Sequence, residues 1–134
     1  MLSIFPQLLT YSFFAPFLLR IVAGAIFVWY GYGKLVLDAD KKSKFFESIK
    51  MKPGWLYVWI FGLIELIGGV FIIVGFMTQL VSLVFALISL ACFFIKWKNP
   101  DSLTTSKMAY VLLFVIFVSL ILTGPGFKSF DLPL

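Results

Sequence analysis

The chain has no histidine, one cysteine (Cys92) and few charged residues, which make up 13% of its 134 positions. Histidine is the commonest metal ligand and the usual proton carrier near neutral pH, and a single thiol cannot close an internal disulfide. We therefore expect no metal site within the chain, and no Ser-His-Asp triad or histidine-ligated haem. Because Cys92 lies in an apolar segment, it is expected to be a small packing residue.

Polar surface is also scarce. Hydrophobic residues make up 62% of the sequence, and the mean hydropathy is +1.08. A soluble protein of this length has too little interior to bury so many apolar side chains, so lipid is expected to surround most of them. The length is expected to form one domain, residues 1–134, without a separate soluble module.

Four apolar segments are separated by shorter polar stretches. They are predicted to be transmembrane helices over residues 12–37, 55–77, 80–96 and 107–123, close to the ~20 residues that cross a hydrocarbon core. A Lys-rich stretch over 40–50 has apolar residues at helical spacing, which predicts an interfacial helix. The expected fold is all-α, a transmembrane antiparallel four-helix bundle. A buried soluble hairpin would need polar faces that the last three segments lack.

The basic residues predict the orientation of these segments. Four spans place both termini on one side, and nine of the eleven basic residues fall on the other side. Because cytoplasmic loops carry the excess of Lys and Arg, both termini of this multi-pass protein of the cell membrane are predicted to lie outside the cytoplasm. Membrane lipid is the expected partner, and no nucleic acid is expected. The nine residues are Lys34, Lys41, Lys42, Lys44, Lys50, Lys52, Lys96, Lys98 and Lys107.

Two charged residues, Arg20 and Glu65, lie well inside predicted spans. A charge at the centre of a span costs ~2.5 to 3.5 kcal/mol or more, so both side chains should face the interior of the bundle. At 1.5 Å per residue they lie ~12 Å and ~17 Å below the same membrane face, which an extended Arg side chain can bridge. We expect the two to meet, either in a ligand or proton site or in an ion pair that only sets helix register.

Glycines accompany both charges at helical spacing. Gly24 and Gly31 follow Arg20 on one stripe, and Gly69 follows Glu65 on another. Small residues on such stripes allow two membrane helices to approach closely, so the first two spans are predicted to pack along these faces. The glycines expected at helix contacts are Gly24, Gly31, Gly68, Gly69 and Gly75.

An aromatic residue and the C-terminal tail are further candidates for the functional site. Tyr30 lies among Trp29 and Tyr32, so it is either part of an interfacial aromatic belt or a phenol that contacts a ring-shaped lipid such as a quinone. The tail is expected to turn and lie across the mouth of the bundle, because proline stops the last helix and the flanking glycines permit positive φ. Asp131 would then approach Arg20. The tail motif comprises Gly124, Pro125, Gly126, Ser129 and Asp131.

At these positions the chain resembles the DoxX family of small four-helix membrane proteins. The resemblance covers about residues 15 to 131, and two departures from the family pattern are Tyr30, where many relatives have histidine, and Gln79, where many have arginine. The matching segments are Leu19-Arg20-Ile21 through Gly24, Phe27 and Gly31 to Lys34-Leu35; Glu65-Leu66-Ile67-Gly68-Gly69 with Gly75 and Thr78; and Gly124-Pro125-Gly126 with Ser129 and Asp131.

The resemblance implies a subunit of a membrane redox assembly, linked to thiol or sulfur chemistry and to quinone as an electron partner. On this interpretation Arg20 and Glu65 line a polar pocket, with Asp131 at its mouth and Tyr30 lower down. Two other interpretations remain open: a non-catalytic small-molecule or lipid-binding and transport protein, and a scaffold for a protein partner. The chain has no redox centre of its own, and a protein partner or homo-oligomer is expected.

Overall fold

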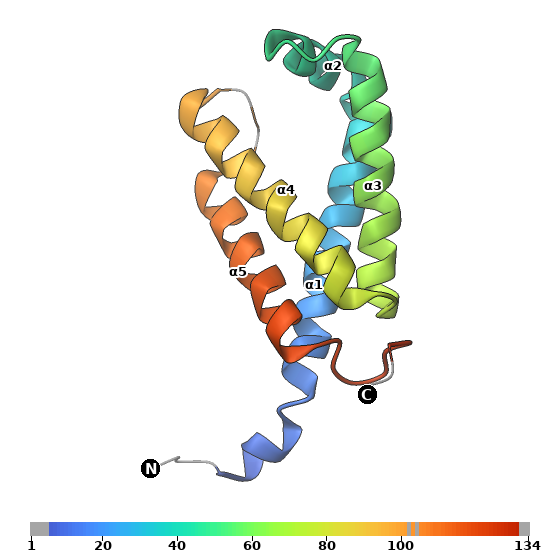
Figure 1. The fold of residues 1–134 in the computed structure, drawn as a ribbon, viewed down its shortest axis with the longest axis vertical. Coiled ribbons are helices and arrows are strands. Elements are labelled where there is room, and N and C mark those ends of the chain that lie inside the picture. The colour runs from blue at the N-terminus through green and yellow to red at the C-terminus, as the bar shows by residue number, and fades with distance from the viewer. Residues whose placement is uncertain (1–5, 102, 104, 132–134) are drawn as a thin grey trace.

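We describe a computed structural model that covers residues 6–101, 103 and 105–131. Residues 132–134 of the expected tail lie outside this part of the chain. Within the described residues all regular structure is helical (Figure 1). The elements are a short 3-10 helix η1 (Pro6–Tyr11), α1 (Phe14–Tyr32), a π-helical turn η2 (Gly33–Leu37), α2 (Ala39–Ser48), α3 (Gly54–Val74), α4 (Thr78–Lys98) and α5 (Lys107–Thr123).

Three helical stretches are long and apolar enough to cross a membrane: Phe14–Leu37, Gly54–Val74 and Thr78–Lys98. The helix α5 is also apolar but has 17 residues. Large apolar side chains lie exposed along these helices, and Leu122 is 81% exposed. Such a surface suits contact with lipid and would be unfavourable in water.

The boundary between α3 and α4 differs from the expected one. The predicted spans were 55–77 and 80–96, whereas α3 ends at Val74 and α4 begins at Thr78. Gly75 ends α3 because it adopts the left-handed conformation, with φ of 78°. Its N–H donates to the Phe71 carbonyl at 2.8 Å, which closes the last turn.

Glycines bring α1 and α3 into close backbone contact. A Cβ added at Gly24 would lie 2.8 Å from the carbonyl oxygen of Gly69, and one added at Gly31 would lie 2.7 Å from that of Gly62. A larger residue at any of these positions would push the helices apart. Because the contacts pair rising numbers in α1 with falling numbers in α3, the two helices run antiparallel.

Aromatic rings connect this pair to the second pair, α4 and α5. Phe27 of α1 stacks on Phe85 of α4 with centroids 4.1 Å apart, and Phe117 of α5 meets the edge of both rings. Gly68 of α3 makes room for Phe85, because a Cβ there would lie 2.6 Å from its ring. Aromatic stacking of this kind adds ~0.5 to 1.5 kcal/mol per pair to the gain from burial.

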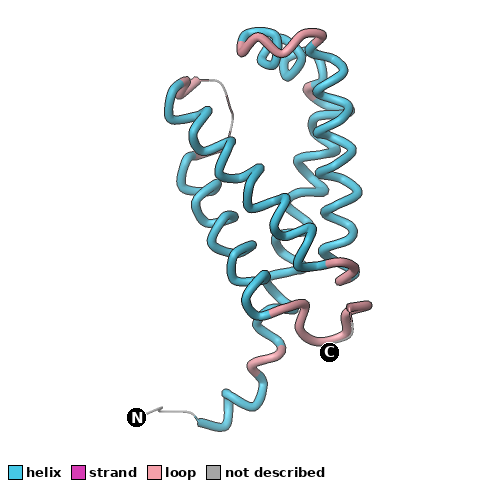
Figure 2. Tube along the Cα trace, in the orientation of Figure 1, coloured by secondary structure: helices cyan, strands magenta, loops and turns pink. Residues whose placement is uncertain are grey.

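The helix α2 packs at one end of this framework, against α3. Its buried Phe46 stacks on Phe61 with centroids 5.6 Å apart and on Tyr57 at 6.1 Å. Figure 2 shows that the α1–α3 and α4–α5 pairs lie close together near the C-terminal tail and separate toward the end that holds α2. The side chains between the separated ends form the site described below.

The glycine contact gives a testable prediction. Replacing Gly31 by Val should lower the free energy of unfolding by about 1–3 kcal/mol, because the new side chain would overlap the backbone of α3. Gly33→Val is the matched control, since a Cβ at Gly33 meets nothing within 4 Å. Unfolding in mixed detergent micelles measures both, and an equal loss in the two variants would contradict the close contact.

Candidate functional site

Arg20 and Glu65 do not meet, so the predicted pairing between them is wrong. Arg20 lies beside Gly75, the residue that ends α3. Glu65 is ten residues away from Gly75 along α3, a rise of ~15 Å. The expected pairing assumed that the ends of the two spans are level. They are staggered, because the contacts of Gly24 with Gly69 set the register and α1 extends past the end of α3.

Arg20 instead binds the C-terminal tail. Its side chain is 1% exposed, and its Nη1 donates to the Pro125 carbonyl at 2.8 Å. Its Nη2 donates to the carbonyls of Phe127 and Lys128 at 3.3 and 3.1 Å. Gly124 and Gly126 have φ of 75° and 73°, so they supply the positive angles at which the tail turns back toward α1.

Asp131 caps the start of α4. Its Oδ1 accepts from the N–H of Met77 at 2.9 Å, and its Oδ2 accepts from that of Thr78 at 2.6 Å. Burial alone would raise the pKa of Asp131, but these two hydrogen bonds and the positive charge of Arg20 outweigh it and hold that pKa below its usual value. Arg20 and Asp131 therefore anchor the tail together at one end of the helices.

The second buried charge, Glu65, pairs with Lys34. Lys34 lies in η2, where the N–H of Asp38 bonds to the carbonyl of Gly33 at 2.9 Å, five residues back. Its Nζ forms an ion pair with Oε1 of Glu65, which is 2% exposed. Oε2 of Glu65 is buried and has no hydrogen-bond partner among the described residues. An unsatisfied buried oxygen is costly, and such π-helical turns are frequent at functional sites.

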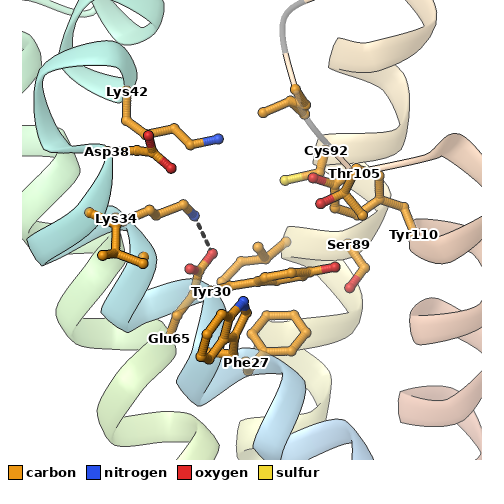
Figure 3. A pocket seen from close by; sticks show the side chains of 15 residues that line it. Phe27, Tyr30, Lys34, Asp38, Lys42, Glu65, Ser89, Cys92, Thr105 and Tyr110 are labelled. Atoms are coloured by element: carbon orange, nitrogen blue, oxygen red, sulfur yellow. Dashed lines mark hydrogen bonds and ion pairs between the residues drawn. The ribbon is translucent and has the colours of Figure 1, made fainter.

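This ion pair lines a cavity of about 290 Å³ between the separated helix pairs (Figure 3). Aromatic side chains from α1 and α5 form much of its wall, and α4 contributes Ser89 and Cys92. The Ser89 hydroxyl is buried and also lacks a hydrogen-bond partner in the described part of the chain. A smaller, mainly apolar cavity of about 130 Å³ adjoins the first and shares Lys34, Glu65 and Cys92 with it.

The predicted pocket residues thus divide between two places. Tyr30 and Glu65 line the cavity, whereas Arg20 and Asp131 lie at the opposite end with the tail. The sequence interpretation counts Lys34 among the basic residues of the cytoplasmic side, although it follows Arg20 on the same helical stripe. That shared stripe was the available signal that Lys34 faces inward. Neither Ser89 nor Lys42 carries a comparable signal in its sequence context.

Lys42 of α2 reaches the cavity from the end where the helices separate. Figure 3 shows its ammonium directed into the space that faces Cys92 and Thr105. Burial and the nearby ammonium of Lys34 lower the pKa of Lys42, and the carboxylates of Asp38 and Glu65 only partly oppose this. The cavity therefore has mainly apolar walls, and its charged lining residues are two lysines and two carboxylates, Lys34, Lys42, Asp38 and Glu65.

Two comparisons with known proteins found matches to the chain. The sequence model of the DoxX family matches residues 15–97, which include Arg20, Lys34, Glu65 and Cys92. The chain belongs to the DoxX family. This DoxX protein is also 35% identical over 115 residues to a Bacillus subtilis protein named "Putative oxidoreductase CatD". The match covers 85% of this chain and 82% of that relative. No solved structure matches the chain.

Family and structure agree on the class of protein. Three apolar helices of spanning length and the DoxX match identify a membrane protein. Most of the cavity-forming segments, from α1 to α4, fall within the matched range. The tail that binds Arg20 lies after the matched range.

The Lys34–Glu65 pair gives a prediction about stability. Lys34→Met alone should cost about 3–5 kcal/mol, because it leaves a buried carboxylate without its counter-charge, whereas Lys34→Met with Glu65→Leu should restore most of that loss. The control is Lys41→Met, which removes an exposed pair with Asp38 and should cost less than about 1 kcal/mol. Unfolding in micelles would contradict the pairing if the double variant were less stable than the single one.

Asp131 gives a prediction about pH. Because its pKa is lowered in the folded protein, the carboxylate stabilises the fold above its unfolded pKa, and this stability is lost as the pH falls through the folded pKa. Asp131→Asn should lower the free energy of unfolding by about 0.5–2 kcal/mol at neutral pH. On acidification this variant should lose less stability than the wild type. Thermal melts at several acidic pH values measure this, with the exposed Asp101→Asn as control. Identical acid profiles for wild type and Asp131→Asn would exclude the cap.

Proposed function

We propose that α1, α3, α4 and α5 all cross the membrane, as an antiparallel four-helix bundle. The 17 residues of α5 span ~26 Å, which approaches the ~30 Å hydrocarbon core when the flanking residues are included. The Lys-rich helix α2 and the loop between α4 and α5 then lie on the cytoplasmic side, where basic residues accumulate. The cavity opens toward that side, and both termini face away from the cytoplasm.

We further propose that the protein is a subunit of a membrane redox assembly that binds a quinone in the cavity. One observation supports this most: a buried ion pair with an unsatisfied carboxylate oxygen lines a partly open cavity with aromatic walls. The volume of about 290 Å³ lies at the lower end of the ~300 to 1,000 Å³ of small-molecule pockets. A quinone ring fits there, with its isoprenoid tail in the adjoining apolar cavity or in lipid.

The residues present match the chemistry of such a ring. A quinone takes up two electrons and two protons when it is reduced. Lys34 and the Tyr30 hydroxyl can donate hydrogen bonds to carbonyl oxygens, and the aromatic rings of the wall can pack on the face of the ligand. Glu65 and Lys34, which already share a hydrogen bond, can hold a proton at Oε1 and exchange it with the ligand.

The electrons must come from elsewhere. The chain has one cysteine, so a dithiol reaction needs thiols that a protein partner supplies. The name of the Bacillus subtilis relative supports an oxidoreductase assignment. A second candidate, a lipid-binding or transport protein, is favoured by the apolar cavity beside the polar one.

Quinone binding can be tested by filling the cavity. Gly33 lines it and a Cβ there meets nothing within 4 Å, so Gly33→Phe should reduce the affinity for 1,4-naphthoquinone at least about tenfold while the fold is kept. Val36→Phe is the control, because Val36 is 60% exposed and does not line the cavity.

Equilibrium binding to the protein in nanodiscs of phosphatidylcholine measures the affinity. Equal affinity in the two variants would contradict a quinone site in this cavity. Lipid extraction from the purified protein separates the rival assignment. A co-purified phospholipid or sterol-like lipid that 1,4-naphthoquinone does not displace would favour lipid binding.

Topology has its own test. Alkaline phosphatase, which is active only outside the cytoplasm, should be active when fused after Leu134 and inactive when fused within the Lys-rich helix α2. Green fluorescent protein at the same two positions should give the reverse pattern. Fluorescence from the C-terminal fusion would contradict the proposed orientation.

A further inference from the structure

Two ammonium groups from different elements face the same cavity. Lys34 comes from η2 and Lys42 from α2, and both line the space of about 290 Å³ (Figure 3). They are close enough for the charge of Lys34 to lower the pKa of Lys42. Bringing like charges together in a partly buried place is unfavourable unless an anion accompanies them.

Each of the two carboxylates nearby forms an ion pair with another lysine. Glu65 forms its ion pair with Lys34, and Asp38 forms one with Lys41 at 3.3 Å. Within the described ranges 6–101, 103 and 105–131, Lys42 has no ion pair of its own, although it points toward Cys92 across the cavity. The thiol of Cys92 is not a counter-ion of comparable strength. Of the four charged residues that line the cavity, Lys42 is therefore the one without an ion pair in the part of the chain that the structure describes.

The walls indicate what kind of anion fits. Phe27 and Tyr30 of α1 and Tyr110 of α5 line the cavity with aromatic rings, and Ile88 adds an aliphatic surface. A small inorganic anion would lose part of its hydration shell against these side chains, and they offer few hydrogen bonds to replace it. A planar ring can pack between them and place a charged oxygen at the mouth.

We propose that the cavity selects a planar, quinone-like ring that bears an ionised oxygen, and that Lys42 binds this oxygen. The inference rests on the proposed quinone site and adds the charge of the ligand to it. Lys34 remains paired with Glu65 and contacts the neutral oxygens of the ring. Lys42 acts as a specificity determinant, since it distinguishes an anionic ring from a neutral one of the same shape.

The anionic headgroup of a phospholipid has part of the same chemistry, because α2 is expected to lie at the membrane interface. The aromatic walls favour a ring over acyl chains, because an acyl chain has no ring face to stack on them. Phosphatidylglycerol in the bilayer provides the comparison between these two sources of negative charge.

The test compares two rings that differ by one ionised oxygen. The anion of 2-hydroxy-1,4-naphthoquinone and neutral 1,4-naphthoquinone are titrated into the full-length protein in phosphatidylcholine nanodiscs. The ratio of their affinities is compared between variants, because partition into lipid is the same for each variant. Lys42→Gln should lower the anion-to-neutral ratio about tenfold, as expected for loss of a charge-assisted hydrogen bond.

Two controls accompany this comparison. Lys44→Gln makes the same change of charge on the same helix, at an exposed residue that lines neither cavity, and should leave the ratio unchanged. Lys42→Arg keeps the charge and should preserve most of the preference. A melting temperature for each variant shows that the fold is retained.

The outcomes separate the two proposals. If neither ring binds the wild-type protein, the quinone site and the inference both fail. If 1,4-naphthoquinone binds but Lys42→Gln and Lys44→Gln give the same ratio, the inference fails and the quinone site stands. If phosphatidylglycerol at a tenth of the lipid abolishes the preference in the wild type, Lys42 binds lipid headgroups and the ring assignment is wrong.

Discussion

The structure depends on how its two buried charges are neutralised inside an apolar bundle. Lipid supplies neither counter-ions nor hydrogen bonds, so each charged side chain needs a partner from the chain itself. Arg20 obtains three backbone carbonyls from the tail. Glu65 obtains the ammonium of Lys34. The Arg20 site and the Lys34–Glu65 pair lie at opposite ends of the bundle, and they give those ends different properties.

One end is closed and the other contains the cavity. Near the tail, the carbonyls around Arg20 and the cap that Asp131 provides for α4 connect the tail to α1 and to α4. In the middle, the rings of Phe27, Phe85 and Phe117 join the two helix pairs. Beyond these rings the pairs separate (Figure 1). Lys34 of η2 and Lys42 of α2 reach the space between them (Figure 3). The same separation that weakens packing there creates room for a ligand.

Much of this arrangement could be predicted from the sequence. The apolar segments, the glycine stripes and the proline and glycines after α5 are local signals, and each corresponds to a helix, a close contact or a turn in the structure. The pairing of charges could not be predicted in the same way. It depends on the stagger of α1 against α3, which is set by backbone contacts at Gly24 and Gly31 and cannot be read from where each apolar run ends. The cavity depends on the divergence of two helix pairs, which no single segment encodes.

The most direct test is an experimental density map of the protein in lipid nanodiscs, at a resolution that shows side chains. The account predicts the Arg20 guanidinium among the carbonyls of Pro125, Phe127 and Lys128, the Glu65 carboxylate against Lys34, and an open space with aromatic walls beside that pair. A map in which Arg20 turns toward Glu65, or in which the helix pairs close and leave no space next to Lys34, would contradict it.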